Sequence, residues 1–385
     1  MSQPGLITDQ QVWDQLAQKL ALEPELALDT ESNSMYAFQE QICLVQIGTA
    51  TDTFLLDPLA VKDLSALGEI LADPGITKVL HGSDYDLRSF ARGYGFRVHS
   101  LFDTEISARF LGMLTPNLAA VLEQFLEVTI AKSRKLQRSN WALRPLTALA
   151  LEYAASDVDH LLPLAEDLRK RLREAGRLEW VQEECLRLEQ AGFQPSSAEA
   201  EGFLRVKGSD RLSPRELAVL KELHAFREAE AERMNWPPYR IMRNESLLRL
   251  AQSPRLPLEQ VEGLAPQMLR RAGGRIRAAL ARGQQGPEYH RAERTRRVNP
   301  WTPKSQARLQ GLKQWRIERG AALGLDPALL WPASSLERLA LQPEDRRELS
   351  GEADSTDVRA WQRANFAREV AAVLSASAPD SAANS

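Results

Sequence analysis

Short apolar segments separated by turn-forming residues occupy residues 26–81, and this alternation constrains the possible fold more than any other feature of the sequence. Apolar runs of this length bounded by turn signals are typical of β-strands. From there to about Gln190 the apolar residues recur at helical spacing. Strands followed by helices predict an α/β domain with a central mixed sheet and helices around it. The expected strands are residues 26–29, 42–48, 53–57 and 76–81.

Two carboxylates stand at the end of the first expected strand. Asp29 and Glu31 are two residues apart, and residues at this spacing on a strand point to the same face. Hard cations such as Mg²⁺ take oxygen ligands, commonly one or two carboxylates together with phosphate and water. The pair therefore predicts part of a site for a divalent cation.

Further acidic residues follow later apolar segments. Asp86 comes after residues 76–80, where we expect a helix to begin, and Asp157 lies four residues after Tyr153 in the helical stretch 151–164. Positions four apart share a helix face, so the Tyr153 hydroxyl and the Asp157 carboxylate can enter one site. We interpret the four carboxylates as metal ligands and, together with the tyrosine, as the catalytic set: Asp29, Glu31, Asp86, Tyr153 and Asp157.

Each of these signals alone also fits an ordinary protein surface. Carboxylates two residues apart recur at Glu23/Glu25 and Asp157/Asp159, and most such pairs are simply solvated. A tyrosine four residues before an aspartate is more often a packed aromatic beside a surface charge. The surface interpretation weakens because several motifs occur in order, each after the expected apolar segment.

The order of the motifs resembles the DEDD exonucleases of the Tyr-containing subclass, and most closely the ribonuclease D family. The motifs are Asp29-x-Glu31, His81-Gly-x-x-x-Asp86 and Tyr153-x-x-x-Asp157. Residues 42–48, 101–104 and 141–146 add to the resemblance, which covers about residues 5–180. One departure is Asn140, a position at which the family more often has Asp.

The resemblance implies a ribonuclease H-like exonuclease domain that releases nucleoside 5′-monophosphates from a 3′ end. It implies two divalent cations, Mg²⁺ or Mn²⁺, one activating the attacking water and the other stabilising the leaving 3′ oxygen. Tyr153 would orient that water. The implied substrate is RNA with a single-stranded 3′ end, and precursor tRNA is the first expectation. We interpret His81, five residues before Asp86, as a structural residue and not as a general base.

Two other functions remain open on the sequence. A DNA 3′ exonuclease would use the same carboxylates, because the chemistry of phosphodiester hydrolysis does not depend on the sugar. A nucleic-acid-binding protein with a decayed nuclease domain is the second alternative. The complete set of four carboxylates and Tyr153 argues against decay, since loss of any one acid would have favoured it.

The charge is divided unevenly along the chain, although the net charge is only −3. Residues 1–180 carry 25 Asp and Glu against 17 Lys and Arg, whereas residues 270–297 carry nine Arg and two Glu. An acidic metal pocket with a basic region elsewhere suits an enzyme that holds the phosphate backbone away from the cut. Solvated helix faces are the alternative interpretation. The candidate RNA contacts are Arg270, Arg271, Arg275 and Arg277.

Composition places the chain among globular proteins without a disulfide framework. Cys43 and Cys185 are the only cysteines, and both lie in apolar surroundings. The first residues lack the basic and apolar regions of a leader peptide, and no run approaches the length of about 18 apolar residues that spans a membrane. We therefore expect a cytoplasmic monomer without membrane contact.

A helical second half follows a break in the pattern at residues 191–198, and it contains an internal repeat. The sequence His224-Ala-Phe-Arg227 recurs as Lys313-Gln-Trp-Arg316, and Ser246–Ala251 recurs as Ser335–Ala340, both at an offset of 89 residues. Two matches in one register predict duplicated helical domains. The first copy resembles an HRDC domain, a small all-α module; the second is more diverged.

These patterns predict an α/β domain followed by two small all-α domains. The expected boundaries are an exonuclease domain at 1–190, a linker at 191–211, an HRDC domain at 212–285, a linker at 286–303, an HRDC-like domain at 304–374 and a disordered tail at 375–385.

Overall fold

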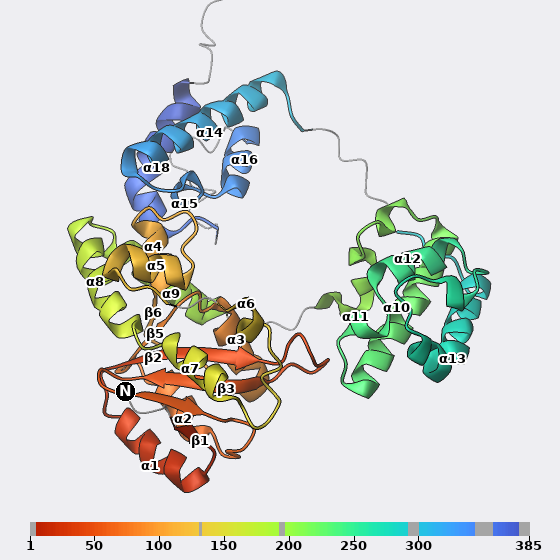
Figure 1. The fold of residues 1–385 in the computed structure, drawn as a ribbon. Helices are drawn as coiled ribbons and strands as arrows, with labels where there is room; N and C mark the ends of the chain where they lie inside the picture. The colour runs from red at the N-terminus through yellow and green to blue at the C-terminus, as the bar shows by residue number, and fades with distance from the viewer. Residues whose placement is uncertain (1–4, 131–132, 192–196, 292–299, 343–356, 377–385) are drawn as a thin grey trace, which may run out of the picture.

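A six-stranded mixed sheet forms the centre of the N-terminal half of the molecule (Figure 1). The computed structural model describes residues 5–130, 133–191, 197–291, 300–342 and 357–376. The strand order is β1-β4-β3-β2-β5-β6, and only the pairings of β3 with β2 and with β4 are antiparallel. The strands are β1 (Leu6–Ile7), β2 (Glu25–Ser32), β3 (Ile42–Gly48), β4 (Thr53–Leu56), β5 (Thr77–Leu80) and β6 (Leu101–Asp103).

All four strands expected from the sequence are present, and β1 and β6 are additional. These two strands have only two and three residues, too few to show an alternating pattern. The α/β class with a mixed sheet is confirmed. Helices around the sheet are α1 (Gln10–Leu20), α2 (Ser65–Ala72), α3 (Asp84–Tyr94), α4 (Thr104–Phe110), α5 (Leu118–Leu126), α6 (Arg134–Gln137), α7 (Ala148–Ser156), α8 (Leu161–Glu174) and α9 (Leu178–Ala191).

The expected helix at 151–164 is interrupted. Helix α7 ends at Ser156, Asp157 is its C-cap residue, and α8 begins only at Leu161. Val158 between them is buried, so the chain turns there to pack an apolar side chain into the core. The turn places Asp157 at a helix end instead of in a helix interior.

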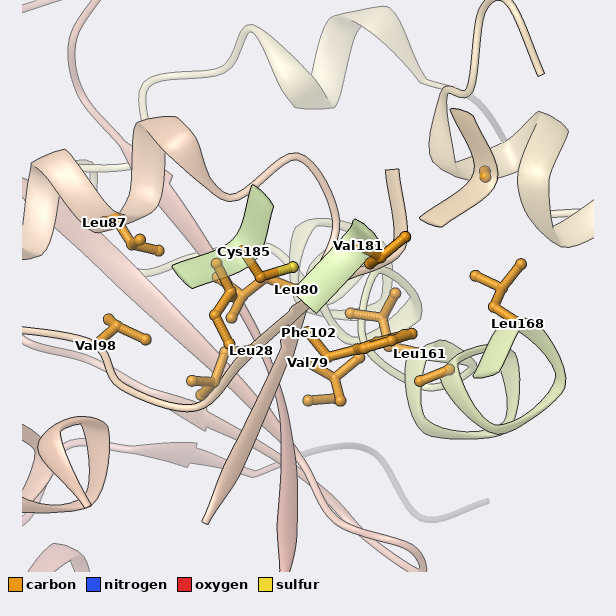
Figure 2. Close-up of a cluster of buried hydrophobic side chains, with 14 of the residues drawn as sticks. Leu28, Val79, Leu80, Leu87, Val98, Phe102, Leu161, Leu168, Val181 and Cys185 are labelled. Carbon is orange, nitrogen blue, oxygen red and sulfur yellow. The ribbon is translucent and has the colours of Figure 1, made fainter. Parts of the chain in front are cut away.

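Apolar side chains from the sheet and the helices beside it form one core (Figure 2). Leu28 and Val79 come from neighbouring strands, and Leu161 and Leu168 pack on them from α8. Cys185 reaches the same core from α9 and is a free thiol, as is Cys43. Within the described residues the cysteines are thus buried apolar side chains, as expected.

A separate helical body, here called the first helical unit (residues 203–289), has its own apolar core. Its long helices α10 and α13 are packed against each other, and Leu220 and Ile276 are fully buried in the core that they share. Its elements, with the preceding η1, are η1 (Ser197–Arg205), η2 (Ser209–Arg211), α10 (Pro214–Met234), α11 (Pro238–Ile241), α12 (Asn244–Gln252), η3 (Leu258–Gln260) and α13 (Pro266–Gln285).

The expected linkers on both sides of this unit are too long. Phe203 and Val206 fall within 191–211 but are 2% and 4% exposed in the core of the unit. On the other side Tyr289, within 286–303, packs edge-on against Phe203 at 4.9 Å between ring centroids. Burial of these side chains ties both segments to the unit. Residues 192–196 and 292–299 lie outside the described residues.

A second helical unit (residues 301–376) repeats the first in register. Its elements are α14 (Pro303–Leu323), α15 (Pro327–Leu330), α16 (Ala333–Leu341) and α18 (Ala360–Ala376). Helices α14, α15 and α16 begin 89 residues after α10, α11 and α12 and have the same lengths of 21, 4 and 9 residues. Both long helices begin with a capping box, at Ser213 and at Thr302. The predicted duplication is therefore confirmed for these three helices.

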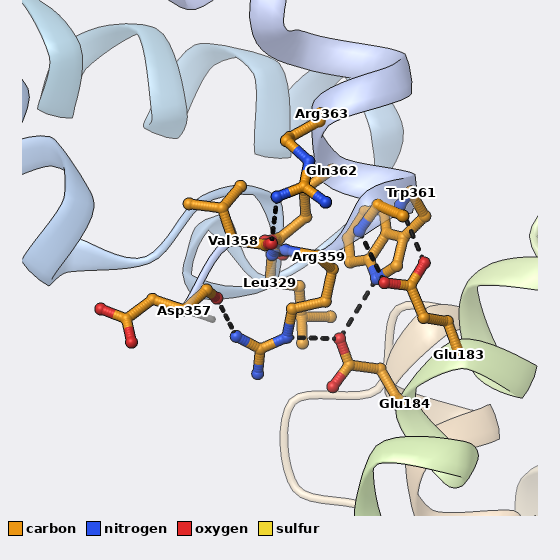
Figure 3. A network of polar contacts seen from close by, with 10 residues as sticks. Glu183, Glu184, Leu329, Asp357, Val358, Arg359, Trp361, Gln362 and Arg363 are labelled. Atoms are coloured by element: carbon orange, nitrogen blue, oxygen red, sulfur yellow. Dashed lines mark hydrogen bonds and ion pairs between the residues drawn. The ribbon is translucent and has the colours of Figure 1, made fainter. Parts of the chain in front are cut away.

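The second helical unit shares the core of the sheet domain instead of forming a separate one. Trp361 of α18 stacks on Trp180 of α9 with 4.7 Å between ring centroids. Glu183 and Glu184 accept hydrogen bonds from the first turn of α18 and from Arg359 (Figure 3). The second helical unit and the sheet domain therefore pack as one body.

The expected tail at 375–385 begins too early. Helix α18 continues through Ala376, because Leu374 is fully buried in its last turn. Residues 377–385 lie outside the described residues, as do 343–356 within the expected second domain. In the described part of the chain, no helix combines the length and the apolar character that crossing a membrane requires.

Candidate active site

Asp29 and Glu31 lie on β2, which occupies the middle of the sheet between β3 and β5. Asp29 is paired with Gln46 and Glu31 with Leu44 across the antiparallel ladder to β3. The register shifts directly after Glu31, so the strand bends where the second carboxylate stands. Both side chains are half-buried. The predicted same-face pair is therefore held by the most constrained strand of the domain.

Asp86 enters the site from the first turn of α3. Its carboxylate accepts a hydrogen bond from the Thr30 hydroxyl, which lies between the two acidic residues of β2. The turn before α3 is fixed by Asp103, which accepts hydrogen bonds from Ser83 N and Ser83 Oγ, both at 2.7 Å. Asp103 thus connects β6 to the start of α3 and sets where the Asp86 side chain emerges.

Tyr153 and Asp157 come from the last turn and the C-cap of α7. The Tyr153 ring lies 6.4 Å from the fully buried Trp141 ring. The segment after Trp141 is anchored by Arg144, whose guanidinium binds both Asp57 carboxylate oxygens at 2.6 and 2.7 Å. This bidentate pair to the end of β4 holds α7 over the sheet. Asn140 stands where the similar exonucleases more often have Asp, and its Oδ1 accepts a hydrogen bond from Ala142 N at 3.2 Å.

The electrostatics place the four carboxylates in one neighbourhood. Burial raises the pKa of Asp29 well above its usual range, and the charges of Asp86, Asp157 and Glu31 raise it further. Burial, followed by repulsion from Asp157 and Asp86, raises the pKa of Glu31 to about 9. The structure therefore brings together all four acids that the sequence singled out.

The two remaining carboxyls are shifted chiefly by burial. Burial raises the pKa of Asp86 to about 7 against the opposing hydrogen bond from Thr30. Burial, with the charge of Asp159, raises the pKa of Asp157 to about 7. Burial and the nearby carboxylates raise the pKa of the Tyr153 hydroxyl above its usual range, so it is a hydrogen-bond donor at neutral pH. A cluster of this kind is stabilised by a cation, which removes the mutual repulsion.

The donor set fits a hard divalent cation. All four candidate ligands are carboxylates, and ions such as Mg²⁺ bind through a few carboxylates and complete their shell with water and substrate phosphate. Among the described residues, no group of three His, Cys, Asp or Glu side chains has an arrangement that could hold a metal ion. An open set of oxygen ligands that phosphate completes is consistent with both observations.

His81 comes directly after β5, and its ring contacts the start of α4. Its Nδ1 shares a hydrogen bond with Thr104 Oγ1 at 2.9 Å. Burial lowers its pKa, against the opposing charges of Asp103 and Glu105. The contact is to the start of α4, which agrees with the interpretation of His81 as a structural residue.

The four arginines singled out as RNA contacts lie on α13, away from the carboxylates, and all are exposed. Arg275 pairs with Glu230 at 2.7 Å, and Arg277 lies 3.8 Å from Glu259. Within the described residues, Arg270 and Arg271 pair with no carboxylate. The two unpaired guanidinium groups are the stronger candidates.

Three residues near the carboxylates have no motif of their own in the sequence. Ser32, Glu40 and Tyr85 form a hydrogen-bonded group at the end of β2 and the start of α3. Tyr85 is 43% exposed although its hydroxyl is engaged. In the sequence, only the position of Tyr85 next to Asp86 indicated that one of these three residues lies near the site.

Proteins of one known family are similar to this chain over most of its length. A family model described as 3′-5′ exonuclease matches residues 4–173, and one described as HRDC domain matches residues 216–280. A ribonuclease D of Pseudomonas paraeruginosa is 33% identical over 321 residues, covering 82% of this chain and 84% of the relative. A ribonuclease D of Granulibacter bethesdensis is 30% identical over 377 residues, covering 96% and 92%. The chain belongs to the ribonuclease D family.

Solved structures extend the likeness to the whole ribonuclease D architecture. The crystal structure of Escherichia coli RNase D has a TM-score of 0.71 and 25% identity, covering 97% of this chain and 99% of that chain. A protein from Bifidobacterium adolescentis, 22% identical, has a TM-score of 0.83 over 97% of both chains and shares the fold.

The chain is a 3′→5′ exoribonuclease with a ribonuclease H-like domain, as the sequence predicted. Its substrate is RNA, and it depends on divalent metal as this exonuclease family does. The HRDC match lies within the first helical unit, where the sequence also placed that module. These findings favour the exoribonuclease over the DNA exonuclease and over the decayed nuclease.

Proposed function

We propose that Asp29, Glu31, Asp86 and Asp157 hold two divalent cations, Mg²⁺ or Mn²⁺, and that Tyr153 completes the catalytic set. The observation that carries this proposal is the hydrogen bond from Thr30, which stands between Asp29 and Glu31 on β2, to the Asp86 carboxylate of α3. Asp157 at the end of α7 is near enough for its charge to raise the pKa values of Asp29 and Glu31. When bound, the cations supply Lewis-acid stabilisation of the phosphate charge and a hydroxide-like water. Their positive charge also offsets the repulsion.

The residues of the chain then have distinct roles in the cleavage. Asp29 and Glu31, on the strand β2 inside the sheet, would hold the ions and so fix where the scissile phosphate binds. The protonated Tyr153 hydroxyl orients the attacking water in line with the leaving 3′ oxygen. The oxygen of this water bonds to phosphorus as the bond from phosphorus to the 3′ oxygen breaks; the water loses a proton to solvent and the leaving oxygen takes one up. Each cycle therefore releases one nucleoside 5′-monophosphate and leaves a new 3′ hydroxyl.

We propose structured RNAs with a single-stranded 3′ end, precursor tRNA among them, as the natural substrates. The solved Escherichia coli relative is described as an exoribonuclease involved in structured RNA processing. On this chain, Arg271 lines a shallow hollow of about 40 Å³ with Trp236 and Arg240, and Arg270 precedes it on α13. Arginines at an exposed helix face suit the phosphate backbone of the RNA body.

We also propose that the enzyme acts as a monomer in the cytoplasm. One chain supplies all four carboxylates and both helical units. The relatives are bacterial enzymes, and bacteria make their RNA in the cytoplasm, so an enzyme that trims it would work there.

A cleavage time course tests this function. RNA and DNA of identical sequence, labelled at the 5′ end, are incubated with the full chain in Mg²⁺, Mn²⁺ or EDTA. We expect a ladder that shortens from the 3′ end on RNA, with nucleoside 5′-monophosphate as product, and none in EDTA. A ladder of equal rate on DNA would shift the assignment toward DNA repair. No ladder on either substrate, with binding retained, would overturn the proposed site.

A further inference from the structure

The first helical unit contacts one loop of the sheet domain, and an asparagine side chain makes two of the hydrogen bonds between them. Asn235, the C-cap residue of α10, accepts hydrogen bonds through Oδ1 from Phe38 N at 3.1 Å and Gln39 N at 2.9 Å. Phe38 and Gln39 belong to the loop of residues 33–41, which connects β2 to β3. This loop projects from the sheet toward the lower end of α10 (Figure 1). It begins two residues after Glu31.

The same loop is hydrogen-bonded to the carboxylate site at its other end. The Tyr85 hydroxyl donates to the Glu40 carboxylate and lies 2.8 Å from Ser32 Oγ. Arg92 of α3 also binds the Glu40 carboxylate. Ser32 directly follows Glu31, and Tyr85 directly precedes Asp86. Through Tyr85, Glu40 therefore connects the two backbone segments that hold these candidate metal ligands.

The contacts form a continuous series across the two bodies. Asn235 fixes Gln39, the next residue binds Tyr85, and Tyr85 binds Ser32. Every step is a direct hydrogen bond or a peptide bond. Elsewhere in the loop the Tyr239 hydroxyl donates to Met35 O at 2.8 Å, and the Phe38 ring packs against the core of the first helical unit.

The backbone position of Asn235 does not require an asparagine. Its φ of 47° is left-handed, a conformation in which glycine is unstrained. The second helical unit has Gly324 at the corresponding position, with φ of 63°. What asparagine adds is the side-chain carbonyl, and that atom is used entirely on the loop.

We propose that Asn235 is a positioning residue for the exonuclease site. It orders residues 33–41 from the first helical unit, and through Glu40 and Tyr85 that loop sets the positions of Glu31 and Asp86. The inference rests on the proposed role of these two carboxylates as metal ligands. By this inference the first helical unit helps to position the carboxylates that cut the 3′ end of the RNA, in addition to any contact with the rest of the RNA.

Asn235→Gly tests the role while keeping the backbone conformation, and Asn235→Asp keeps an oxygen that can accept both hydrogen bonds. The substrates are a 5′-labelled trinucleotide, too short to reach α13, and a hairpin RNA with a 3′ tail. Mg²⁺ binding is followed separately, as the rise in Tm during a Mg²⁺ titration of the full chain without RNA.

We expect Asn235→Gly to weaken apparent Mg²⁺ affinity and to lower kcat on the trinucleotide, each by roughly three- to tenfold. Asn235→Asp should stay within about twofold of the unaltered chain. Tyr85→Phe removes the last hydrogen bonds of the series and should give the same defect. In the double variant the two losses should not multiply, because they break the same series.

Glu31→Gln serves as the reference for the site itself. If Glu31→Gln is inactive while Asn235→Gly matches the unaltered chain in both assays, the positioning role is wrong and the site stands. A defect of Asn235→Gly confined to the hairpin RNA also overturns the role, because it would show an RNA contact. Full activity of Glu31→Gln would instead overturn the proposed site.

Discussion

Asn235 and Gly324 occupy the same position in the two helical units, 89 residues apart, and each lies where its unit meets the sheet domain. Both end a 21-residue helix in the left-handed conformation. Asn235 uses its side chain on residues 38 and 39, whereas the Gly324 carbonyl lies against the backbone of Gly112. The C-terminal end of the long helix therefore contacts the sheet domain in both units. In the first unit the contact is a polar side chain, and in the second it is close backbone packing.

The close packing at Gly112 gives a prediction on stability. A Cβ at this position would come within 2.6 Å of Gly324 O, and the φ of Gly112 is 98°. Gly112→Ala should therefore lower the free energy of unfolding by about 2–4 kcal/mol, from backbone strain and overpacking together. Gly176→Ala is the matched control, because Gly176 has φ of 66° and no atom near its Cβ position. Denaturant unfolding should show the smaller loss for the control; equal losses would mean that the contact to Gly324 contributes nothing.

Asp157→Asn is expected to abolish cleavage, since it removes a proposed metal ligand without changing side-chain size. A loss of several kcal/mol of transition-state stabilisation corresponds to at least about a thousandfold in rate. Asp159→Asn is the control, because Asp159 is exposed and its carboxylate binds Thr53 Oγ1 at 2.5 Å. Single-turnover rates on a 5′-labelled RNA distinguish the two. Comparable activity of the two variants would remove Asp157 from the ligand set.

Tyr153→Phe should slow turnover by roughly a hundredfold while leaving Mg²⁺ affinity unchanged. The hydroxyl is protonated at neutral pH because burial and the carboxylates raise its pKa, so it can orient water but not accept a proton from it. The ring remains packed near Trp141 in the variant, and stability should be preserved. Measuring kcat and the Mg²⁺-induced rise in Tm separates the roles: a large loss of Mg²⁺ affinity would identify Tyr153 as part of the metal site.

Much of the site could be predicted from the sequence because each carboxylate follows a local apolar pattern. Asp29 ends a recognisable strand segment, and Asp86 follows another. The duplication could also be predicted, because two short sequence matches recur at one offset of 89 residues, and the equal lengths of α10 and α14 agree with it. The bounds of the linkers could not be read this way, because Phe203 looks like any isolated aromatic until its partner Tyr289 is known.

The supporting contacts could not be predicted because they join distant parts of the chain. Asn235 and Phe38 are 197 residues apart, and Arg144 and Asp57 are 87 apart. Neither pair belongs to a periodic pattern or a short motif. Only the packing of the first helical unit beside the β2–β3 loop brings the first pair together. Sequence periodicity reports local burial, whereas such pairs depend on the full topology.

The raised pKa values predict how stability depends on pH in the absence of metal. Burial raises the pKa of Asp86 and of Asp157 to about 7 in the folded protein, from the usual aspartate value of 3.8 in the unfolded chain. Between these values the unfolded chain has released protons that the folded chain retains, so the free energy of unfolding should fall as pH rises. Because burial raises the pKa of Glu31 to about 9, the free energy of unfolding should continue to fall up to about that pH.

Mg²⁺ should oppose that loss, because it binds the deprotonated carboxylates. At fixed Mg²⁺ concentration, the rise in Tm should be larger at pH 8 than at pH 6. The control is Asp157→Asn, in which one titrating ligand is gone and the pH dependence should be smaller. A rise in Tm that is the same at both pH values would contradict the linkage between these carboxyls and the metal.

The arginines of α13 predict how RNA binding depends on salt. Arg270 and Arg271 are exposed and, among the described residues, pair with no carboxylate, whereas Arg275 is paired with the buried Glu230. Counterion release makes the slope of log K against log salt concentration proportional to the number of phosphates neutralised. Replacing Arg270 and Arg271 together by Ala should reduce the slope by about two for a hairpin RNA, and Arg275→Ala should reduce it by less than one. Turnover on a trinucleotide should not change in the double variant. Identical slopes for the double variant and the unaltered chain would exclude Arg270 and Arg271 from the RNA interface.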